Sequence, residues 1–426
     1  MKPKANSDVA SVFPIPSDWT IKSVSELARI TTGPFGTLLK AAEYSDLEGV
    51  PVISVGEIRN GYLRVTDETP RVPEEVVRRL PKYLLREEDI VFGRKGAVSR
   101  SARITKAESG WFLGSDGISI RLLDPSLSRY LAYQFLSDRA QKWLTTNATG
   151  TTMATLNQAI LKNLCVPLPV CREEQCAIAE ALGDADALIE SLSLLLSKKR
   201  QIKRGVVEEL LSGKKRLPGF NGAWVLETIG SAAEVDPENL QGGTSRDFLF
   251  NYIALEDVER GVLLSHSEQR FGSAPSRARR RLRLDDVLVG TVRPNLQSHL
   301  LFKEKEGEWV GSTGFSVVRS TGRLHPGYLF EHLFAATVNR QIDALLTGSS
   351  YPAINSRDVR GLEIPLPSFE EQAAIFDVLS SINEEIASLE RRLAKACALK
   401  QGMMQVLLTG RTRLVNFASS TEAVVG

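Results

Sequence analysis

The chain has 426 residues, and at about 150 residues per domain this length favours two or three domains. Its composition is 42% hydrophobic and 24% charged, with 32 glycines and 19 prolines, which excludes a collagen-like, wholly disordered or purely coiled-coil chain. The net charge of +2 neither requires nor excludes a polyanionic partner, so evidence for a nucleic-acid interface must come from local features.

Membrane and metal sites are not expected. No run approaches the roughly 18 apolar residues of a membrane span, and the first ten residues contain two lysines but no apolar core of a signal peptide. We therefore expect a cytoplasmic protein with no membrane partner. The four cysteines are too few for a disulfide scaffold and their spacing matches no zinc pattern, so we expect no metal and no cofactor.

Taken in chain order, the first half predicts an arm, a mixed domain and a long helix. Residues 1–14 are expected to form a flexible arm, and residues 15–170 an α+β domain with β-rich runs at 50–55, 89–92 and 117–122 and a helix at 131–143. Residues 171–213 follow as one helix, since apolar residues recur there at alternating steps of four and three, which is typical of a coiled-coil seam. Gly213 is placed to end this helix.

The second half repeats the first. With an offset of 197, residues 173–217 match residues 370–414 at 18 of 45 positions, where average residue usage gives roughly three by chance. This duplication predicts a second α+β domain at residues 214–368, with a helix at 328–346, then a second long helix at 369–410 and a tail at 411–426. Core helices of a larger bundle are the alternative for the two long segments.

Connectivity constrains how the repeats are arranged. The first helix leads out of the first domain and the second leads back towards it, so pairing of their seams makes them antiparallel. The predicted fold class is therefore α+β, with two repeated domains separated by two long antiparallel coiled-coil helices in a pseudo-two-fold and circular organisation. Such an arrangement suits duplex DNA with two half-sites at a set spacing, or two protein ligands.

Loops that follow the predicted strands contain the candidate DNA-binding residues. Arg94, Lys95 and Arg100 follow one strand, and Arg293 and Asn295 follow the corresponding strand of the second copy; arginine and asparagine make bidentate contacts to guanine and adenine. A solvated basic turn is the alternative. Hydroxyl-rich loops provide further candidates, whose side chains could donate to phosphates or bases. A plain structural turn is the alternative for these loops. The candidates are Thr32, Thr37, Thr151, Thr152, Ser349, Ser350 and Tyr351.

Residues 277–283 contain five arginines. They are numerous enough for several phosphate contacts, but Asp285 and Asp286 follow directly, so an internally paired surface is an equally supported interpretation.

Catalytic motifs are missing from the sequence. It contains no Gly-x-Gly-x-x-Gly, phosphate-binding loop or nucleophile elbow, and no Asp/Asn-Pro-Pro-Tyr motif of an amino-methylating enzyme. We therefore predict no catalytic residues, and a self-contained DNA-modifying enzyme is disfavoured.

Several motifs together resemble one family. Residues 167–178 read Pro-Leu-Pro-x-x-x-Glu-Glu-Gln-x-x-Ile, and residues 365–375 repeat this pattern one residue shorter. With residues 31–40 (TTGPFGTLLK) and 210–213 (LLSG), they resemble the specificity (S) subunits of type I restriction–modification systems. The resemblance covers nearly the whole chain and implies two target recognition domains, each reading half of a bipartite DNA sequence, with helices that set the gap and dock two methyltransferase (M) subunits.

The same resemblance implies which components carry the chemistry. S-adenosylmethionine binds M, and ATP-driven translocation and cleavage belong to the restriction (R) subunit, which reaches this chain through the M–S complex. Apolar residues off the helix seam are then candidates for the surface that binds M: Leu188, Leu195, Val207 and Met404. The alternative is that they pack against the chain's own domains. The alternative function is a specificity-like DNA-binding scaffold of another phage-defence assembly.

Overall fold

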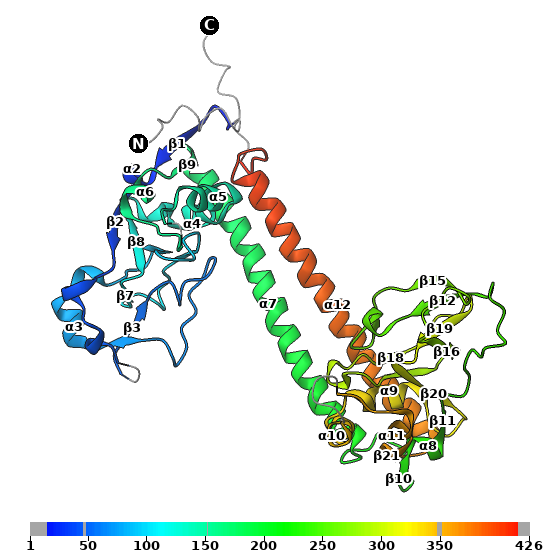
Figure 1. The fold of residues 1–426 in the computed structure, drawn as a ribbon. Coiled ribbons are helices and arrows are strands. Elements are labelled where there is room, and N and C mark those ends of the chain that lie inside the picture. Colours follow the sequence, from blue (N-terminus) through cyan, green and yellow to red (C-terminus); the bar gives the residue numbers. More distant parts are fainter. Residues whose placement is uncertain (1–14, 46–47, 151, 347–351, 416–426) are drawn as a thin grey trace. The chain divides into compact units, whose positions relative to one another are not determined.

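A computed structural model describes residues 15–45, 48–150, 152–346 and 352–415. The chain divides into two compact units (Figure 1). Unit 1 comprises residues 1–192 and 392–426, and unit 2 comprises residues 193–391. Unit 1 is therefore assembled from both ends of the chain. Among the described residues, none of the helices is both long and apolar enough to cross a bilayer.

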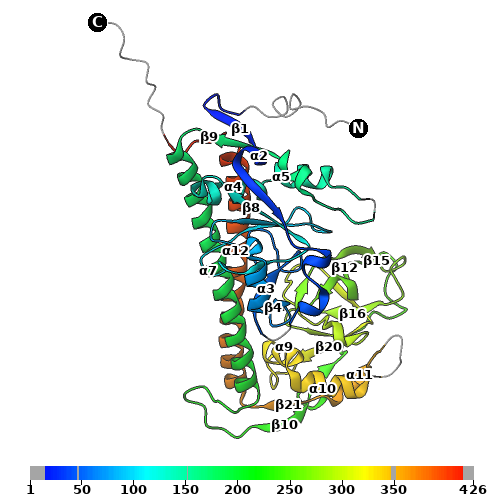
Figure 2. The ribbon, with the colours of Figure 1, turned by 90° about the vertical axis from the view of Figure 1, so that its left-hand side faces the viewer.

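The described residues of unit 1 form three β-sheets. Strand β1 (Trp19–Ser23) pairs antiparallel with β9 (Cys165–Pro169) beside the start of the first long helix (Figure 2). A four-stranded antiparallel sheet has the order β2 (Ala28–Thr32), β8 (Gly117–Leu122), β5 (Ile90–Gly93) and β6 (Ser101–Arg103). A third sheet has the order β4 (Arg71–Val72), β3 (Val50–Ile53) and β7 (Phe112–Leu113), and its β3–β7 pair is parallel.

Short helices complete unit 1. They are α2 (Val24–Leu27), α3 (Glu74–Arg79), α4 (Ser128–Leu136), α5 (Asp138–Asn147) and α6 (Gln158–Lys162), with 3₁₀ turns η1 (Gly36–Leu38), η2 (Ala41–Glu43), η3 (Pro81–Tyr83) and η4 (Pro125–Leu127). The single helix expected at residues 131–143 is divided between α4 and α5. Ser137 lies between them in an extended conformation, and its hydroxyl accepts a hydrogen bond from the Ala140 backbone N–H, which caps α5.

Unit 2 repeats the two-stranded sheet and the four-stranded antiparallel sheet of unit 1, whereas its remaining sheets have more strands. Strand β10 (Val225–Thr228) pairs with β21 (Glu363–Leu366), and a four-stranded sheet has the order β11 (Ala233–Val235), β20 (Phe315–Ser320), β17 (Val287–Gly290) and β18 (Leu300–Leu301). The other sheets are β15 (Ser267–Arg270), β12 (Leu249–Ile253), β19 (Trp309–Ser312) and β16 (Ala278–Leu282), and the pair β13 (Val258–Glu259) and β14 (Val262–Leu263). The β12–β19 pair is parallel, like β3–β7 in unit 1.

The shorter helices and 3₁₀ turns of unit 2 are α8 (Ile229–Ala232), η5 (Leu255–Asp257), η6 (Pro294–Leu296), α9 (Pro326–Phe334), α10 (Ala336–Leu345) and α11 (Ser356–Gly361). Four of these helices, α8 to α11, follow the order of α2, α4, α5 and α6 in unit 1. The helix expected at residues 328–346 is divided, because Ala335 between α9 and α10 has an extended backbone.

Both predicted long helices are formed. They are α7 (Arg172–Leu211) and α12 (Phe369–Leu407), each about 60 Å long at 1.5 Å per residue. In unit 1, Ile178 and Leu182 of α7 share one buried cluster with Met404 and Leu407 of α12. In unit 2, the opposite ends of these helices contribute to the core through Leu210, Leu211, Ile375 and Leu379. Each unit is thus built on a segment of both helices.

Equivalent polar contacts fix the start of α7 in unit 1 and of α12 in unit 2. The indole N–H of Trp19 donates to Glu174, and that of Trp224 donates to Glu371. Both carboxylates are buried, and each also pairs with an arginine that lies after the other helix, Arg413 for Glu174 and Arg216 for Glu371. The duplication detected in the sequence therefore extends to individual hydrogen bonds.

Candidate nucleic-acid interface

In unit 1, the turn after β5 presents Arg94 and Lys95. The Arg94 backbone N–H donates to the Asp116 carbonyl at 2.8 Å, and the Arg94 guanidinium Nη1 donates to the Ser115 carbonyl at 3.2 Å. The Lys95 ammonium pairs with the Asp116 carboxylate at 3.0 Å. Arg100 is half-buried on the return of the same turn, where its carbonyl accepts the Gly93 N–H. The side chains of Arg94 and Lys95 are thus held against Ser115 and Asp116, which precede β8.

Arg94 retains hydrogen-bonding capacity. Its Nε–H is buried and has no partner among the described residues, and its guanidinium lies 5.5 Å from the centroid of the Phe35 ring. A guanidinium has five N–H donors in a planar fork, so only part of this capacity is used within the chain. Arg94 is therefore suited to bind a planar pair of acceptors such as the edge of a guanine.

An open groove of about 680 Å³ places Arg94 beside two other segments. Thr32, at the end of β2, accepts a hydrogen bond at 3.0 Å from the side-chain amide of Gln158, at the start of α6. Thr32 is thus brought together with Arg94, as a shared interface requires. The side chains that line the groove include Thr32, Phe35, Leu38, Lys82, Arg94 and Gln158. Thr37 is exposed in η1 and does not line this groove.

The hydroxyl-rich loop of unit 1 lies next to the Arg94 turn. Thr149 and Thr155 exchange backbone hydrogen bonds at the base of this loop, and the Gly96 N–H donates to the Ala154 carbonyl at 2.8 Å. Thr152 is exposed at the tip, whereas Thr151 lies outside the described residues. Two segments singled out by the sequence therefore lie side by side.

The equivalent turn of unit 2 follows β17 and contains Arg293 and Asn295, both exposed. Its backbone contacts show that Arg293 occupies the place of Gly96, because the Arg293 N–H donates to the Pro352 carbonyl as the Gly96 N–H does to Ala154. Arg94 is matched by Thr291: Leu156 donates to Arg94 O and Ile354 donates to Thr291 O. The prediction that Arg293 is in the corresponding loop holds, but with a shift of two residues relative to Arg94.

This shift leaves Arg293 with an unusual backbone. Its φ is 48°, in the left-handed region that Gly96 also occupies with φ 69°, and Gln297 closes the turn with φ 54°. A non-glycine residue in this region costs about 1 kcal/mol or more. The neighbouring candidates Ser349, Ser350 and Tyr351 lie outside the described residues.

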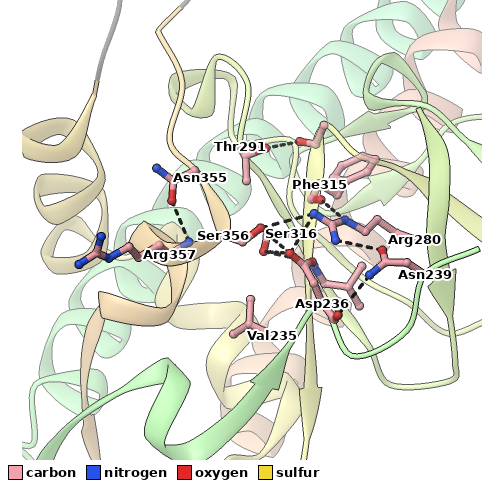
Figure 3. A network of polar contacts seen from close by, with 12 residues as sticks. Val235, Asp236, Asn239, Arg280, Thr291, Phe315, Ser316, Asn355, Ser356 and Arg357 are labelled. Carbon is pink, nitrogen blue, oxygen red and sulfur yellow. Dashed lines mark hydrogen bonds and ion pairs between the residues drawn. The ribbon is translucent and has the colours of Figure 1, made fainter. Parts of the chain in front are cut away.

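The arginine-rich stretch of unit 2 forms strand β16. Figure 3 shows the side chains of Arg280, Ser316 and Ser356 converging on the Asp236 carboxylate, which lies 2.9 Å from Arg280. Burial lowers the pKa of Arg280, and the neighbouring Asp236 opposes this effect. Arg281 and Arg283 pair with Glu238. For these three arginines the internally paired interpretation is therefore correct.

Comparison with known proteins identifies the family. The model of the type I restriction modification DNA specificity domain matches residues 16–199 and 296–396. The chain belongs to this family. The matched segments include the Arg94 turn and all of α6, whereas the arginine-rich strand β16 lies between them.

Individual relatives agree with the family assignment along nearly the whole chain. The type I restriction enzyme MjaVIII specificity subunit of Methanocaldococcus jannaschii is 22% identical over 434 residues, covering 94% of this chain and 95% of that protein. The crystal structure of a type I restriction–modification S subunit from M. genitalium covers 96% of this chain and 99% of its own, with a TM-score of 0.59 at 16% identity. These comparisons do not favour the alternative of a scaffold from another defence assembly.

A second solved structure supports the same fold. It comes from work on complex assembly and conformational transition of the type I R-M system, and it covers 94% of this chain and 100% of its own with a TM-score of 0.53 at 17% identity.

The apolar residues of this segment are a further signal for the groove. Phe35 and Leu38 line the groove with 60% and 45% of their surface exposed, whereas the contacts predicted within residues 31–40 were the threonines alone. Gln158 was missed because its contact with Thr32 joins residues 126 positions apart. Lys82, 4.8 Å from the Tyr83 ring, is a further basic residue of the groove.

The predicted partner-surface residues differ in exposure. Leu188 and Leu195 on α7 are 47% and 41% exposed, as a docking surface requires. Val207 is half-buried against the core of unit 2. Met404 differs from the exposed position expected of it, because it is only 9% exposed and packs in the core of unit 1. For Met404 the structure favours the alternative, packing against the chain's own domain.

Proposed function

We propose that this chain is the non-catalytic DNA-reading subunit of a type I restriction–modification complex, in which each unit reads one half of a bipartite sequence. One observation supports this proposal most strongly. Both units place an exposed strand-end turn against a second loop through the same backbone hydrogen bonds, Gly96 to Ala154 and Arg293 to Pro352. A repeated scaffold that presents different side chains suits two different half-sites.

The chemistry of each turn suggests what it reads. Unit 1 presents Arg94, Lys95 and Arg100, with Thr32 and Thr152 on neighbouring segments, a set suited to guanine edges and phosphates. We also assign Thr37 and Thr151 to DNA contact. Unit 2 presents Arg293 and Asn295, and asparagine favours adenine. Ser349, Ser350 and Tyr351 complete the set that we assign to DNA contact. We assign residues 15–170 and 214–368 as the two target recognition domains on this basis.

We infer that α7 and α12 form an antiparallel coiled coil that relates the two domains by a pseudo-two-fold axis. The ion pairs support this arrangement: Asp186 pairs with Lys400, whereas Arg200, farther along α7, pairs with Glu390, which lies earlier on α12. In this arrangement the helices, residues 171–213 and 369–410, set the gap between half-sites. The pairing of Arg413 with Glu174 likewise supports a circular organisation of the chain.

The partners that we propose are duplex DNA, two M subunits and, through them, R subunits. The exposed apolar side chains of Leu188 and Leu195 on α7 are candidate contacts for M. S-adenosylmethionine and ATP would then be bound by M and R rather than by this chain.

Methylation mapping tests the proposed function. Cells that contain M subunits should methylate a bipartite sequence only when this chain is present, and exchange of residues 94–96 should change one half-site alone. The matched control exchanges residues 291–293 of unit 2 and should change the other half-site. Methylation that does not depend on the chain, or a change in both half-sites after a single exchange, would contradict the proposal.

A further inference from the structure

The loop after β2 exposes two apolar side chains next to Arg94. Phe35 is 60% exposed and Leu38 is 45% exposed, although both lie on the wall of the groove. Scattered exposed apolar residues are common on proteins, but two in one short loop, beside a basic side chain, form a specific surface. We call this surface, Phe35 with Leu38, the apolar tip.

The backbone holds the apolar tip in place. A Cβ atom on Gly33 would lie 1.7 Å from the Gly114 carbonyl oxygen, so the loop packs there in a way that only glycine permits. The Gly33 N–H also donates to the Gly117 carbonyl at 3.0 Å. At the other end of the turn, Gly36 has a left-handed φ of 65°. The exposure of Phe35 is therefore a fixed property of the loop.

Unit 2 treats the corresponding loop differently. There, the segment after β11 is tied down by the buried Asp236, which receives hydrogen bonds from Ser316 and Ser356 (Figure 3). The apolar tip is thus a feature of the unit 1 loop, and we expect its ligand to belong to the half-site of unit 1.

We propose, on the basis of the proposed function, that Phe35 contacts the C5-methyl group of a thymine next to the base pair that Arg94 binds. The C5-methyl of thymine is the apolar group that base edges present in the major groove. A phenyl ring set against the major-groove edge of a purine would bury a donor or acceptor without a partner, and cytosine lacks the methyl group. The 5.5 Å between the Arg94 guanidinium and the Phe35 ring is close enough for the two groups to meet neighbouring base pairs.

Two observations favour this ligand over other occupants of the groove. Arg94 covers one face of the Phe35 ring, which disfavours insertion of that ring between stacked bases. The groove is also lined by Lys82 and Arg94, a basic lining that suits DNA better than an apolar protein surface.

The test uses the full-length chain and duplexes that contain the mapped sequence, with each thymine replaced in turn by deoxyuridine, which lacks only the methyl group. At one position in the half-site of unit 1, wild-type affinity should fall about fourfold, the value expected for one methyl contact. Phe35→Ala should bind the thymine duplex about as weakly as wild type binds the uracil duplex, and should no longer distinguish the two. Phe35→Leu, which keeps an apolar side chain, should retain part of the discrimination.

The matched control is Leu296→Ala, which removes an apolar side chain that is 54% exposed in unit 2. This variant should keep the wild-type response to uracil in the half-site of unit 1. Several results would overturn the inference while leaving the proposed function intact: a half-site without thymine on either strand, an equal uracil response in Phe35→Ala, or an enhanced 2-aminopurine fluorescence that reports unstacking by the ring. Failure of wild type to distinguish the mapped sequence from a scrambled duplex would instead overturn the proposed function.

Discussion

The two units are similar where they contact the long helices and different where they face outward. The Trp19 indole N–H donates to Glu174 at the start of α7, and the Trp224 indole N–H donates to Glu371 at the start of α12, both at 3.2 Å. By contrast, Gly96 of one strand-end turn is replaced by Arg293 in the other. The difference indicates that one scaffold is kept for assembly on the helices while its loops are free to take up different side chains.

The largest expected effect comes from comparing substitutions at Met404 and at Leu195. Met404→Asp places a charge in the core of unit 1 and should reduce the free energy of unfolding of this unit by about 3 kcal/mol or more, because a buried unpaired charge is costly. Leu195→Asp changes a side chain that is 41% exposed and should leave unfolding unchanged while weakening co-purification with M subunits. Denaturant unfolding and pull-down assays measure both. Normal stability of Met404→Asp would show that this position is not part of the core.

The helices could be predicted from the sequence, but Met404 could not be assigned correctly from it. Periodicity predicts which faces of α7 and α12 are apolar, since a helix repeats every 3.6 residues. It does not predict that α4 of unit 1 also lies against the end of α12, where the Gln134 amide donates to the Leu408 carbonyl 274 positions away. Because Met404 lies off the seam, its side chain was predicted to be exposed, whereas it is buried in the core of unit 1.

The binding loops, too, could be predicted only in part from the sequence. The basic turns were found because arginine and lysine after a strand are visible in the sequence. Their surroundings were not, since Asp116 fixes Lys95 and Asp236 fixes Arg280 only in the folded chain. The two-residue shift between Arg94 and Arg293, by contrast, follows from the offset of 197, which pairs position 293 with position 96, and the hydrogen bonds of the two turns agree with it.

The second prediction tests whether the segments that follow α7 and α12 stabilise the two units in the same way. Arg413→Ala leaves the buried Glu174 carboxylate with the Trp19 N–H but without its guanidinium partner, and should destabilise unit 1 by about 2–3 kcal/mol. Arg216→Ala should destabilise unit 2 instead, since Arg216 pairs with Glu371 there. Hydrogen exchange of peptides from each unit distinguishes the two results. Equal loss of hydrogen-exchange protection in both units after either substitution would show that each ion pair does not stabilise its own unit separately.

The third prediction compares the turns themselves. Arg94→Ala should cost about 1–3 kcal/mol of binding free energy and relax only the half-site of unit 1. Arg293→Gly introduces the residue that unit 1 has in the same backbone position, so it should relieve the left-handed strain and leave folding intact while it weakens reading of the other half-site. Binding to a panel of single-base variants measures both. An equal loss of binding affinity for every DNA sequence would identify these arginines as phosphate contacts.

The smallest expected effect concerns a buried position where the repeats differ. In unit 1, the Gln134 amide donates to the Tyr130 hydroxyl and to the Leu408 carbonyl. His332 is its counterpart in unit 2; both ring nitrogens are buried without partners among the described residues, and burial lowers the pKa of His332 to about 3. An unfolded histidine titrates near 6.5, so between pH 6.5 and about 3 the unfolded chain binds a proton that the folded chain does not.

Unit 2 should therefore lose stability as the pH is lowered through this window, by about 1–2 kcal/mol at pH 5 from His332 alone. His332→Gln supplies the residue of unit 1 and should remove this part of the acid sensitivity, because glutamine does not titrate. The reciprocal Gln134→His should transfer acid sensitivity to unit 1. Unfolding measured at pH 7 and pH 5, with hydrogen exchange to assign the unit, tests both variants. An unchanged difference between the two pH values in His332→Gln would show that this histidine does not control the acid response.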